Sequence, residues 1–334
     1  SPLINGGIVP LRPPAGPDAM INDMVLLRAF EKRSDIARSE DTTCFRLFNS
    51  SGDGVDGVTV DVYGEYLLVQ FYSPGLFRQA GDVAAALERF CSLHMPWILG
   101  GVLKDRTKTN APDPARIRKS ALLFGNLPPA VYTVRQCGIN VGVDLLGGQH
   151  TGVFLDMREA RRLLAPHYPR AGALVNLFCY TGIFSVHALA CGVKSALNVD
   201  LSPGALKRAK ANYRLNGLPV DDRDFIGNDS ESFMKLMVKK GRKFDLVIYD
   251  PPSFSRNGRK VFSVKRDFRR HLDLISRLSE GGMVMTSTNM HAVSECEYIA
   301  FHPETWKNIF LCHEPDDFPS VTGHYLKIGL WKVN

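Results

Sequence analysis

Two stretches, LVNLFCYTG at residues 174–182 and FDLVIYDPPSF at residues 244–254, decide the fold predicted for this chain. In each, a run of apolar residues ends at a turn, and a helical pattern follows further along the chain. The stretches at 195–200 and 283–289 repeat this pattern, and 224–229 is a shorter version of it. Strands that alternate with helices predict an α/β fold with a doubly wound, Rossmann-like sheet covered by helices on both faces. In such a sheet the ligand crevice lies outside the carboxyl ends of the strands.

The residues that precede this sheet predict a smaller α/β accessory domain. Two runs rich in β-branched and aromatic residues, 58–63 and 66–72, flank Gly64-Glu65, which indicates a hairpin with the glycine at positive φ. A helix over 77–93 and a strand over 97–102 follow. The predicted division of the chain is an N-terminal extension with a linker helix at 1–40, the accessory domain at 41–130 and the sheet domain at 131–334.

Two segments connect these parts. Residues 22–38 mix apolar and basic side chains at helical spacing, which predicts an amphipathic helix with a basic outer face that includes Arg33. Residues 132–146 predict a second hairpin, with Gly138 in it. A glycine-rich turn then leads to a helix that begins at about Asp156.

The composition is that of a globular protein. Hydrophobic residues at 45% and charged residues at 22% are near the globular average, which excludes a disordered or fibrous chain. No stretch approaches the roughly 20 apolar residues of a membrane helix. Seven cysteines without a CxxC pair predict a reducing, cytoplasmic compartment and no metal site. The net charge of +7 favours a polyanionic partner. The protein is predicted to be a monomer or a homodimer.

Polar residues follow the first three strands of the predicted sheet. The first strand ends in a turn at 178–182, where helix-start amides can meet a charged ligand, but one glycine does not make a dinucleotide fingerprint. Asp200 follows the second strand, where it either accepts hydrogen bonds from ribose hydroxyls or caps the helix that begins at Pro203. Asn228 and Asp229 follow the third strand and suit an adenine amine or a plain turn.

The sharpest signal is Asp250-Pro251-Pro252-Ser253-Phe254, which follows the apolar run at 246–249. Two successive prolines fix φ and force Asp250 into an extended conformation. A carboxylate on such a stiff loop can hold a planar base by its edge, and Phe254 offers a face for stacking. A purely structural Pro-Pro turn is the alternative.

Basic residues gather after this loop. Between residues 256 and 270 seven basic side chains stand against one acid, Asp267, with phenylalanines between them, a mixture that suits phosphate contacts and base stacking. A solvated helix face is the alternative. A second cluster at 104–119 either extends this track or makes a loop soluble. The predicted RNA-binding residues are Arg256, Arg259, Lys260, Lys265, Arg266 and Arg269.

An acid after the second strand and Asp-Pro-Pro after the fourth, without a pyrophosphate loop, resemble the class I S-adenosylmethionine-dependent methyltransferases. The segments TGVFLDMR (151–158), VNLFCYTGIFSVHA (175–188), DPPSF (250–254) and HYLKIGLWKV (324–333) are similar to the bacterial 23S ribosomal RNA large-subunit methyltransferases, which make 5-methylcytosine or 7-methylguanine. The segment at 46–73 resembles the accessory domain of that family. The similarity covers residues 22–334, without the RNA-binding PUA domain with which many members begin.

The resemblance implies S-adenosyl-L-methionine as the cofactor and RNA as the partner. It places Asp250, with Pro251, Pro252 and Phe254, at the transfer site between cofactor and target. The cofactor-binding residues that it implies are Phe154, Asp156, Arg158, Asn176, Phe178, Tyr180, Thr181, Gly182, Asp200, Leu201, Asn228, Asp229 and Asp250.

The atom that accepts the methyl group depends on whether a cysteine is present. Carbon 5 of a pyrimidine reacts only through a thiolate adduct at C6. By resemblance, Asn289 occupies the place of that cysteine, as in the 7-methylguanine-forming relatives, and Cys296 lies seven residues further on. Guanine N7 has an in-plane lone pair, so its methylation needs alignment in a dry pocket and no general base. The same holds for exocyclic amines.

The function predicted from these residues is methyl transfer to a guanine N7 of large-subunit ribosomal RNA during rRNA processing. The alternatives are a methyltransferase that acts on a small molecule or a protein, and a non-catalytic RNA-binding protein.

Overall fold

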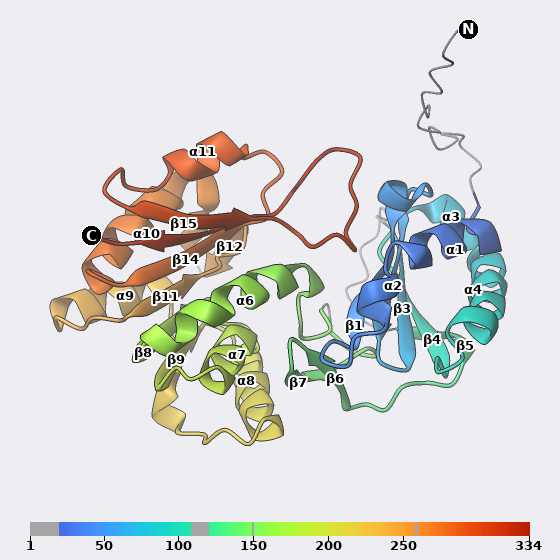
Figure 1. Cartoon of the computed structure of the whole chain (residues 1–334), viewed down its shortest axis with the longest axis horizontal. Coiled ribbons are helices and arrows are strands. Elements are labelled where there is room, and N and C mark those ends of the chain that lie inside the picture. Colours follow the sequence, from blue (N-terminus) through green and yellow to red (C-terminus); the bar gives the residue numbers. More distant parts are fainter. Residues whose placement is uncertain (1–19, 108–119, 149, 258–259) are drawn as a thin grey trace, which may run out of the picture.

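A seven-stranded sheet forms the larger lobe of the molecule (Figure 1). The computed structural model describes residues 20–107, 120–148, 150–257 and 260–334, without the side chains of 254–262. The strand order is β10-β9-β8-β11-β14-β16-β15; β16 is antiparallel to both its neighbours, and the pairs from β10 to β14 are parallel. The strands are β8 (Ala173–Leu177), β9 (Ser195–Asp200), β10 (Phe225–Gly227), β11 (Leu246–Tyr249), β14 (Met283–Thr288), β15 (Lys307–Cys312) and β16 (Lys327–Lys332).

Helices pack on both faces of this sheet, which confirms the predicted doubly wound α/β fold. All four side chains of β11 are buried and alternate between two cores. Val247 and Tyr249 pack with α10 residues such as Phe268, whereas Leu246 and Ile248 pack on the opposite face. The helices are α6 (Arg158–Leu164), α7 (Ile183–Ala190), α8 (Pro203–Leu215), α9 (Ser230–Lys239), α10 (Val264–Leu278) and α11 (Glu295–Ala300).

Strand order reverses beside β8, because the chain passes from β8 to β9 on one side and later returns to β11 on the other. Loops from the two sides diverge at such a point, so a crevice opens at the carboxyl ends of β8, β9 and β11. The hairpin predicted around Gly138 is present as β6 and β7, with this glycine at a φ of +79°. It packs on α8. The strands of this hairpin are β6 (Tyr132–Gln136) and β7 (Ile139–Val143).

The smaller lobe contains a five-stranded sheet in the order β1-β2-β3-β4-β5. The hairpin predicted around Gly64 is present as β2 and β3, with this glycine at a φ of +59°. The strand predicted at 97–102 lies three residues later, and the helix predicted at 77–93 is split. The elements are α1 (Asp23–Glu31), α2 (Ser34–Ala37), β1 (Cys44–Asn49), β2 (Val58–Tyr63), β3 (Tyr66–Phe71), α3 (Pro74–Arg78), α4 (Ala80–His94), β4 (Gly100–Asp105) and β5 (Ala121–Gly125).

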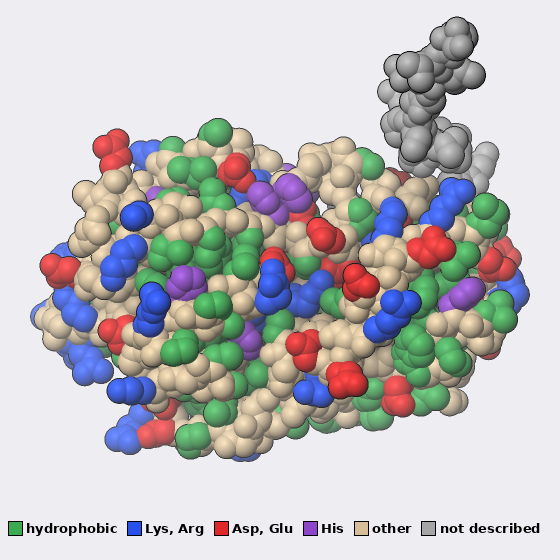
Figure 2. All heavy atoms as spheres, in the orientation of Figure 1, with side chains coloured by type: hydrophobic (Ala, Val, Ile, Leu, Met, Phe, Trp, Pro, Cys, Tyr) green, Lys and Arg blue, Asp and Glu red, His purple; other side chains and the backbone are tan. Residues whose placement is uncertain are grey.

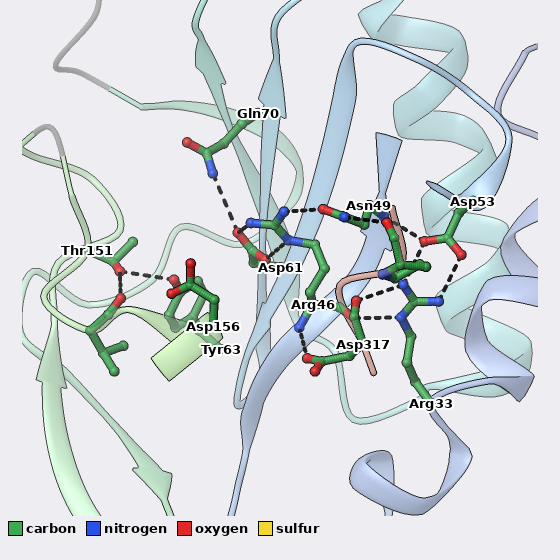
Figure 3. A network of polar contacts seen from close by, with 12 residues as sticks. Arg33, Arg46, Asn49, Asp53, Asp61, Tyr63, Gln70, Thr151, Asp156 and Asp317 are labelled. Atoms are coloured by element: carbon green, nitrogen blue, oxygen red, sulfur yellow. Dashed lines mark hydrogen bonds and ion pairs between the residues drawn. The ribbon is translucent and has the colours of Figure 1, made fainter. Parts of the chain in front are cut away.

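The prediction of one continuous helix over 22–38 with Arg33 on its outer face is wrong. The chain forms two helices, α1 and α2, with a break at Arg33, and the Arg33 side chain is buried. The guanidinium pairs with Asp53 at 2.6 Å and donates to the carbonyl of Asp317 at 2.8 Å. Asp317 lies in the β15–β16 loop, which reaches the smaller lobe in Figure 1, and its carboxylate also accepts from the Arg46 amide and from Arg158. This network ties the two lobes together (Figure 3).

We expect Asp53→Ala to lower the free energy of unfolding by about 3–5 kcal/mol, because it leaves the Arg33 guanidinium buried without a carboxylate. Both side chains of this pair are at most 1% exposed. The control is Arg89→Ala, which breaks a pair with Asp23 whose side chains are 57–59% exposed, and this change should cost less than about 1 kcal/mol. Urea unfolding at pH 7 measures both, and equal losses would contradict the role given to the buried pair.

Within the ranges that the structure describes, no helix is long and apolar enough to cross a membrane, and no group of three or more His, Cys, Asp or Glu residues is arranged to hold a metal ion.

Candidate active site

A cavity of about 630 Å³ opens at the carboxyl ends of β8, β9 and β11. Its volume is in the range of small-molecule and cofactor pockets. The predicted site residues that line it are Phe154, Asp156, Asn176, Phe178, Tyr180, Thr181, Asp200, Leu201, Asp250, Pro251 and Pro252. The strand topology therefore brings together residues from four separate parts of the chain.

The turn after β8 is strained and faces the cavity. Phe178 and Tyr180 have φ angles of +58° and +50°, a left-handed conformation that costs a non-glycine residue about 1–2 kcal/mol. Gly182 adopts the same conformation without that cost, at a φ of +72°. The buried Thr181 hydroxyl donates to the Gly152 carbonyl at 2.6 Å and so fastens the turn to the loop before α6. Strain held in this way is typical of ligand sites.

Asp200 ends β9 with its carboxylate at the cavity. One carboxylate oxygen accepts from the Tyr180 amide at 2.9 Å and the other from the Ser202 amide at 2.8 Å. The cap of α8 itself is the Ser202 hydroxyl, so Asp200 steadies two turns and still presents an acceptor to the cavity. Asn176, which is buried within β8, is tied to Ser185 of α7 at 3.0 Å.

Asn228 and Asp229 form the turn before α9, and adenine binding by them stays a prediction. Asp229 caps α9 by accepting from the Ser232 amide at 3.0 Å, and Asn228 accepts from the Asp229 amide. Neither is among the residues that line the cavity, whereas the next residue, Ser230, is.

Arg158 does not line the cavity; its guanidinium pairs with Asp317 at 2.6 Å. Arg161, nearly one turn further along α6, lines it instead and is only 2% exposed. The Arg161 guanidinium donates to Gln136 and to the Phe154 carbonyl. Its Nε has no hydrogen-bond partner, and no carboxylate of the described residues forms an ion pair with it. A buried cation without a counter-ion is costly, so this position is suited to an anionic ligand group.

Two carboxyl groups, those of Asp156 and Asp250, line the cavity and are close enough to affect each other's pKa. Asp250 follows β11 and accepts from the Ser287 hydroxyl, while Asp156 accepts from the Tyr325 hydroxyl at 2.7 Å. Enclosure by the cavity walls, together with the nearby Asp156 charge, raises the pKa of Asp250 to about 6. Enclosure also raises the pKa of Asp156. Carboxylates crowded in this way are suited to a cationic ligand group.

Asn289 lies where the resemblance places a cysteine in other relatives. Its side-chain oxygen accepts from the Ser253 hydroxyl at 2.6 Å, and both residues line the cavity beside the two prolines. The lining does contain Cys179, but burial raises the pKa of this thiol well above its usual value, which disfavours the nucleophilic thiolate. Cys296 is exposed and is not among the lining residues.

The predicted RNA-binding cluster is partly neutralised by acids. Arg266 pairs with Asp267 at 2.7 Å, and Arg269 donates to the Ala300 carbonyl at 2.7 Å. Lys265 is exposed on α10. The remaining predicted RNA-binding residues, Arg256 and Lys260, lie on β12 (Phe254–Asn257) and β13 (Lys260–Ser263), and so does Phe254 of the predicted transfer site. The side chains of these three residues are outside the description, as is the whole of Arg259. On the face seen in Figure 2, basic and acidic side chains are interspersed over both lobes.

The cavity at the switch point of this sheet, with an acid after β9 and Asp-Pro-Pro after β11, is the arrangement expected of an S-adenosylmethionine-dependent methyltransferase. The comparison with known families agrees, because the model of the S-adenosylmethionine-dependent methyltransferases matches residues 115–322. The chain belongs to this family, and S-adenosyl-L-methionine is its cofactor.

Relatives are similar over most of the chain. The Bacillus subtilis (strain 168) protein YwbD, which carries the name of a ribosomal RNA large subunit methyltransferase, is 32% identical over 317 residues, 91% of this chain and 78% of that protein. The Ribosomal RNA large subunit methyltransferase I of Photobacterium profundum is 31% identical over 265 residues. The match to it covers 78% of this chain but 64% of that protein.

A solved structure is similar in fold over nearly the whole chain. SMU.776, described as a methyltransferase and crystallised with S-adenosylhomocysteine, superposes with a TM-score of 0.84 at 28% identity, over 95% of this chain and 83% of that one. The complex of aTrm5 with tRNALeu shares the fold at a TM-score of 0.52 and 16% identity.

The cavity suits the charges of this cofactor. The buried Arg161 guanidinium, whose Nε has no hydrogen-bond partner, is compatible with a carboxylate, and the two acids Asp156 and Asp250 of the lining are compatible with a positively charged sulfonium. Asp200 offers the acceptor that a ribose requires.

Proposed function

We propose that this enzyme methylates a nucleobase of large-subunit ribosomal RNA, with guanine N7 as the acceptor atom. The observation that carries the proposal is the position of Asp250 and the double proline at the edge of the cofactor cavity, where a base can enter edge-on. Its relatives named as large-subunit rRNA methyltransferases and the net charge of +7 support RNA as the substrate.

In this proposal different residues of the cavity bind different parts of the cofactor. Arg161 binds the methionine carboxylate, Asp200 binds the ribose, and Leu201 and Ser230 border the adenine end. The bound cofactor supplies an electrophilic methyl group. Asp250 faces the sulfonium and, through the stiff Pro251-Pro252 loop, keeps the acceptor base in line with that methyl group.

The acceptor is assigned to a nitrogen because the cavity offers no reactive thiol. Methyl transfer to C5 needs a cysteine adduct, and the position beside Ser253 is occupied by Asn289. Guanine N7 needs no proton removal, so the side chains only have to align the base and exclude water. We propose that Lys265, Arg266 and Arg269, with the basic residues of the β12–β13 hairpin, contact the RNA backbone.

The test uses ribosomal RNA from a strain that lacks the gene, incubated with the enzyme and tritium-labelled S-adenosyl-L-methionine. We expect label in deproteinised RNA, and 7-methylguanosine after digestion and mass spectrometry of the nucleosides. Label in protein or in small molecules alone would favour a methyltransferase that acts on those molecules. A different methylated nucleoside would refute the N7 assignment. Calorimetry that shows RNA binding without cofactor binding would indicate a non-catalytic RNA-binding protein.

A further inference from the structure

Three aromatic rings run from the cavity to its rim. The rings of Tyr180 and Phe154 lie 5.4 Å apart between centroids, and those of Phe154 and His150 lie 5.5 Å apart. All three residues line the cavity. Tyr180 belongs to the turn after β8, whereas Phe154 is 42% exposed and His150 is exposed. A large aromatic side chain left in solvent at the mouth of a pocket is a common mark of a binding surface.

Two cationic side chains hold the backbone on either side of His150. Lys104 of β4 is buried and its ammonium donates to the carbonyls of Gly147 and Gly148, at 3.2 Å each, in the turn that precedes His150. Arg208 of α8 donates to the Thr151 carbonyl between His150 and Phe154. The rim is therefore built from both lobes, because β4 belongs to the five-stranded sheet and α8 to the larger lobe.

These cations are close enough to influence one another. Burial, together with the charges of Arg106 and Arg208, lowers the pKa of Lys104 to about 8, and Asp144 opposes this shift. Arg106 and Lys104 also contribute to the lowered pKa of His150, after desolvation. Like charges held together in this way are relieved by a bound anion. The aromatic rings and the positive field thus occur in one place, beside the opening through which a substrate must pass.

We propose that this rim, made of His150, Phe154 and Tyr180 with Lys104, Arg106 and Arg208, binds one unpaired nucleotide of a single-stranded RNA next to the base that is methylated. Its base stacks on the His150 ring, the outermost of the three, and its phosphate lies in the field of the arginines. Every base has a face that stacks on an aromatic ring, and every nucleotide carries a phosphate, so the rim recognises strandedness rather than sequence. The inference rests on the proposed function and names the form of RNA that the site accepts.

The experiment measures two affinities for each protein variant. One is for S-adenosylhomocysteine, by calorimetry, and the other is for a fluorescent 12-nucleotide single-stranded RNA that contains 2-aminopurine, a base whose fluorescence falls when it stacks. We expect His150→Ala to weaken RNA binding about tenfold and to remove the quenching, with cofactor affinity changed less than about threefold, because His150 is not among the predicted cofactor-binding residues. His150→Phe should restore both RNA readouts, because the aromatic face is kept.

A matched control is Trp97→Ala, since Trp97 is also an exposed aromatic residue, at 42%, but lies on the smaller lobe outside the cavity lining. It should leave both affinities unchanged. Arg106→Gln should lower the slope of log affinity against log salt by about one, the contribution of one phosphate contact.

The outcomes separate this inference from the proposed function. If His150→Ala weakens cofactor binding and spares RNA binding, the ring belongs to the cofactor site and the inference is wrong. If it changes neither affinity while the wild type methylates ribosomal RNA, the inference fails and the proposed function stands. A wild type that neither binds nor methylates RNA overturns both.

Discussion

Asp250→Asn should abolish methyl transfer while making the cofactor-free enzyme more stable at neutral pH. The substitution keeps the size of the side chain and its contact with Ser287, but it removes the negative charge at the transfer site. We expect a loss of at least about 100-fold in kcat/KM, the usual effect of removing one electrostatic group that faces the reacting atoms. RNA affinity should change little, because Asp250 orients a base and does not contact phosphates.

The gain in stability follows from the sign of the pKa shift. The cavity raises the pKa of Asp250 from 3.8 to about 6, so the folded state holds the proton more tightly than the unfolded state. The ionised carboxylate therefore destabilises the fold, by up to about 3 kcal/mol above pH 6, and this penalty disappears progressively between pH 6 and pH 4. Asparagine carries no such penalty. The difference in Tm between variant and wild type should thus be positive at pH 7.5 and vanish near pH 4.

The measurements are single-turnover methyl transfer and thermal unfolding over that pH range. Asp273→Asn, which replaces an exposed carboxylate on α10, is the control and should change neither. In the wild type, kcat/KM should fall as the pH drops below about 6, because the working form of Asp250 is the carboxylate. Turnover at the wild-type rate in Asp250→Asn would remove Asp250 from the chemistry.

The fold could be predicted because its signals are local. Each strand of the larger sheet is a short apolar run followed by a turn and a helix, and the topology of such sheets then places every strand end at one edge. Asp200 and Asp250 were found in this way, as residues at the ends of β9 and β11, without knowledge of any contact. The elements that were misplaced, such as β4, lie in the smaller lobe, where turns and helix breaks are less clearly marked.

The side-chain partners could not be predicted because they depend on residues far away in the sequence. Arg33 looks like a solvated helical residue until Asp317, 284 residues further on, is brought against it. The choice between Arg158 and Arg161 depends on how α6 lies against the sheet, and residue spacing does not determine this. Arg161 did carry one signal, a further arginine on the same predicted helix, but only the packing shows which of the two lacks an acidic partner.

Arg161→Met should remove cofactor binding without loss of stability, because the arginine is a buried cation with which no carboxylate of the described residues forms an ion pair. A charge-assisted hydrogen bond to a carboxylate contributes about 1.5–3 kcal/mol, so the Kd for S-adenosylhomocysteine should rise at least tenfold. Methionine fills a similar volume and needs no counter-ion, which offsets the loss of the hydrogen bonds to Gln136 and to the Phe154 carbonyl, so the free energy of unfolding of the cofactor-free protein should stay equal or increase. The matched control is Arg162→Met on the same helix, since Arg162 is 66% exposed and pairs with Glu159. Calorimetry and urea unfolding decide the matter: unchanged cofactor affinity in Arg161→Met, or an equal loss in the control, would mean that the carboxylate of the cofactor lies elsewhere. Weaker cofactor binding together with an equal or higher free energy of unfolding would instead show that Arg161 serves the cofactor, since the cofactor-free protein is no more stable with arginine than with methionine at this position.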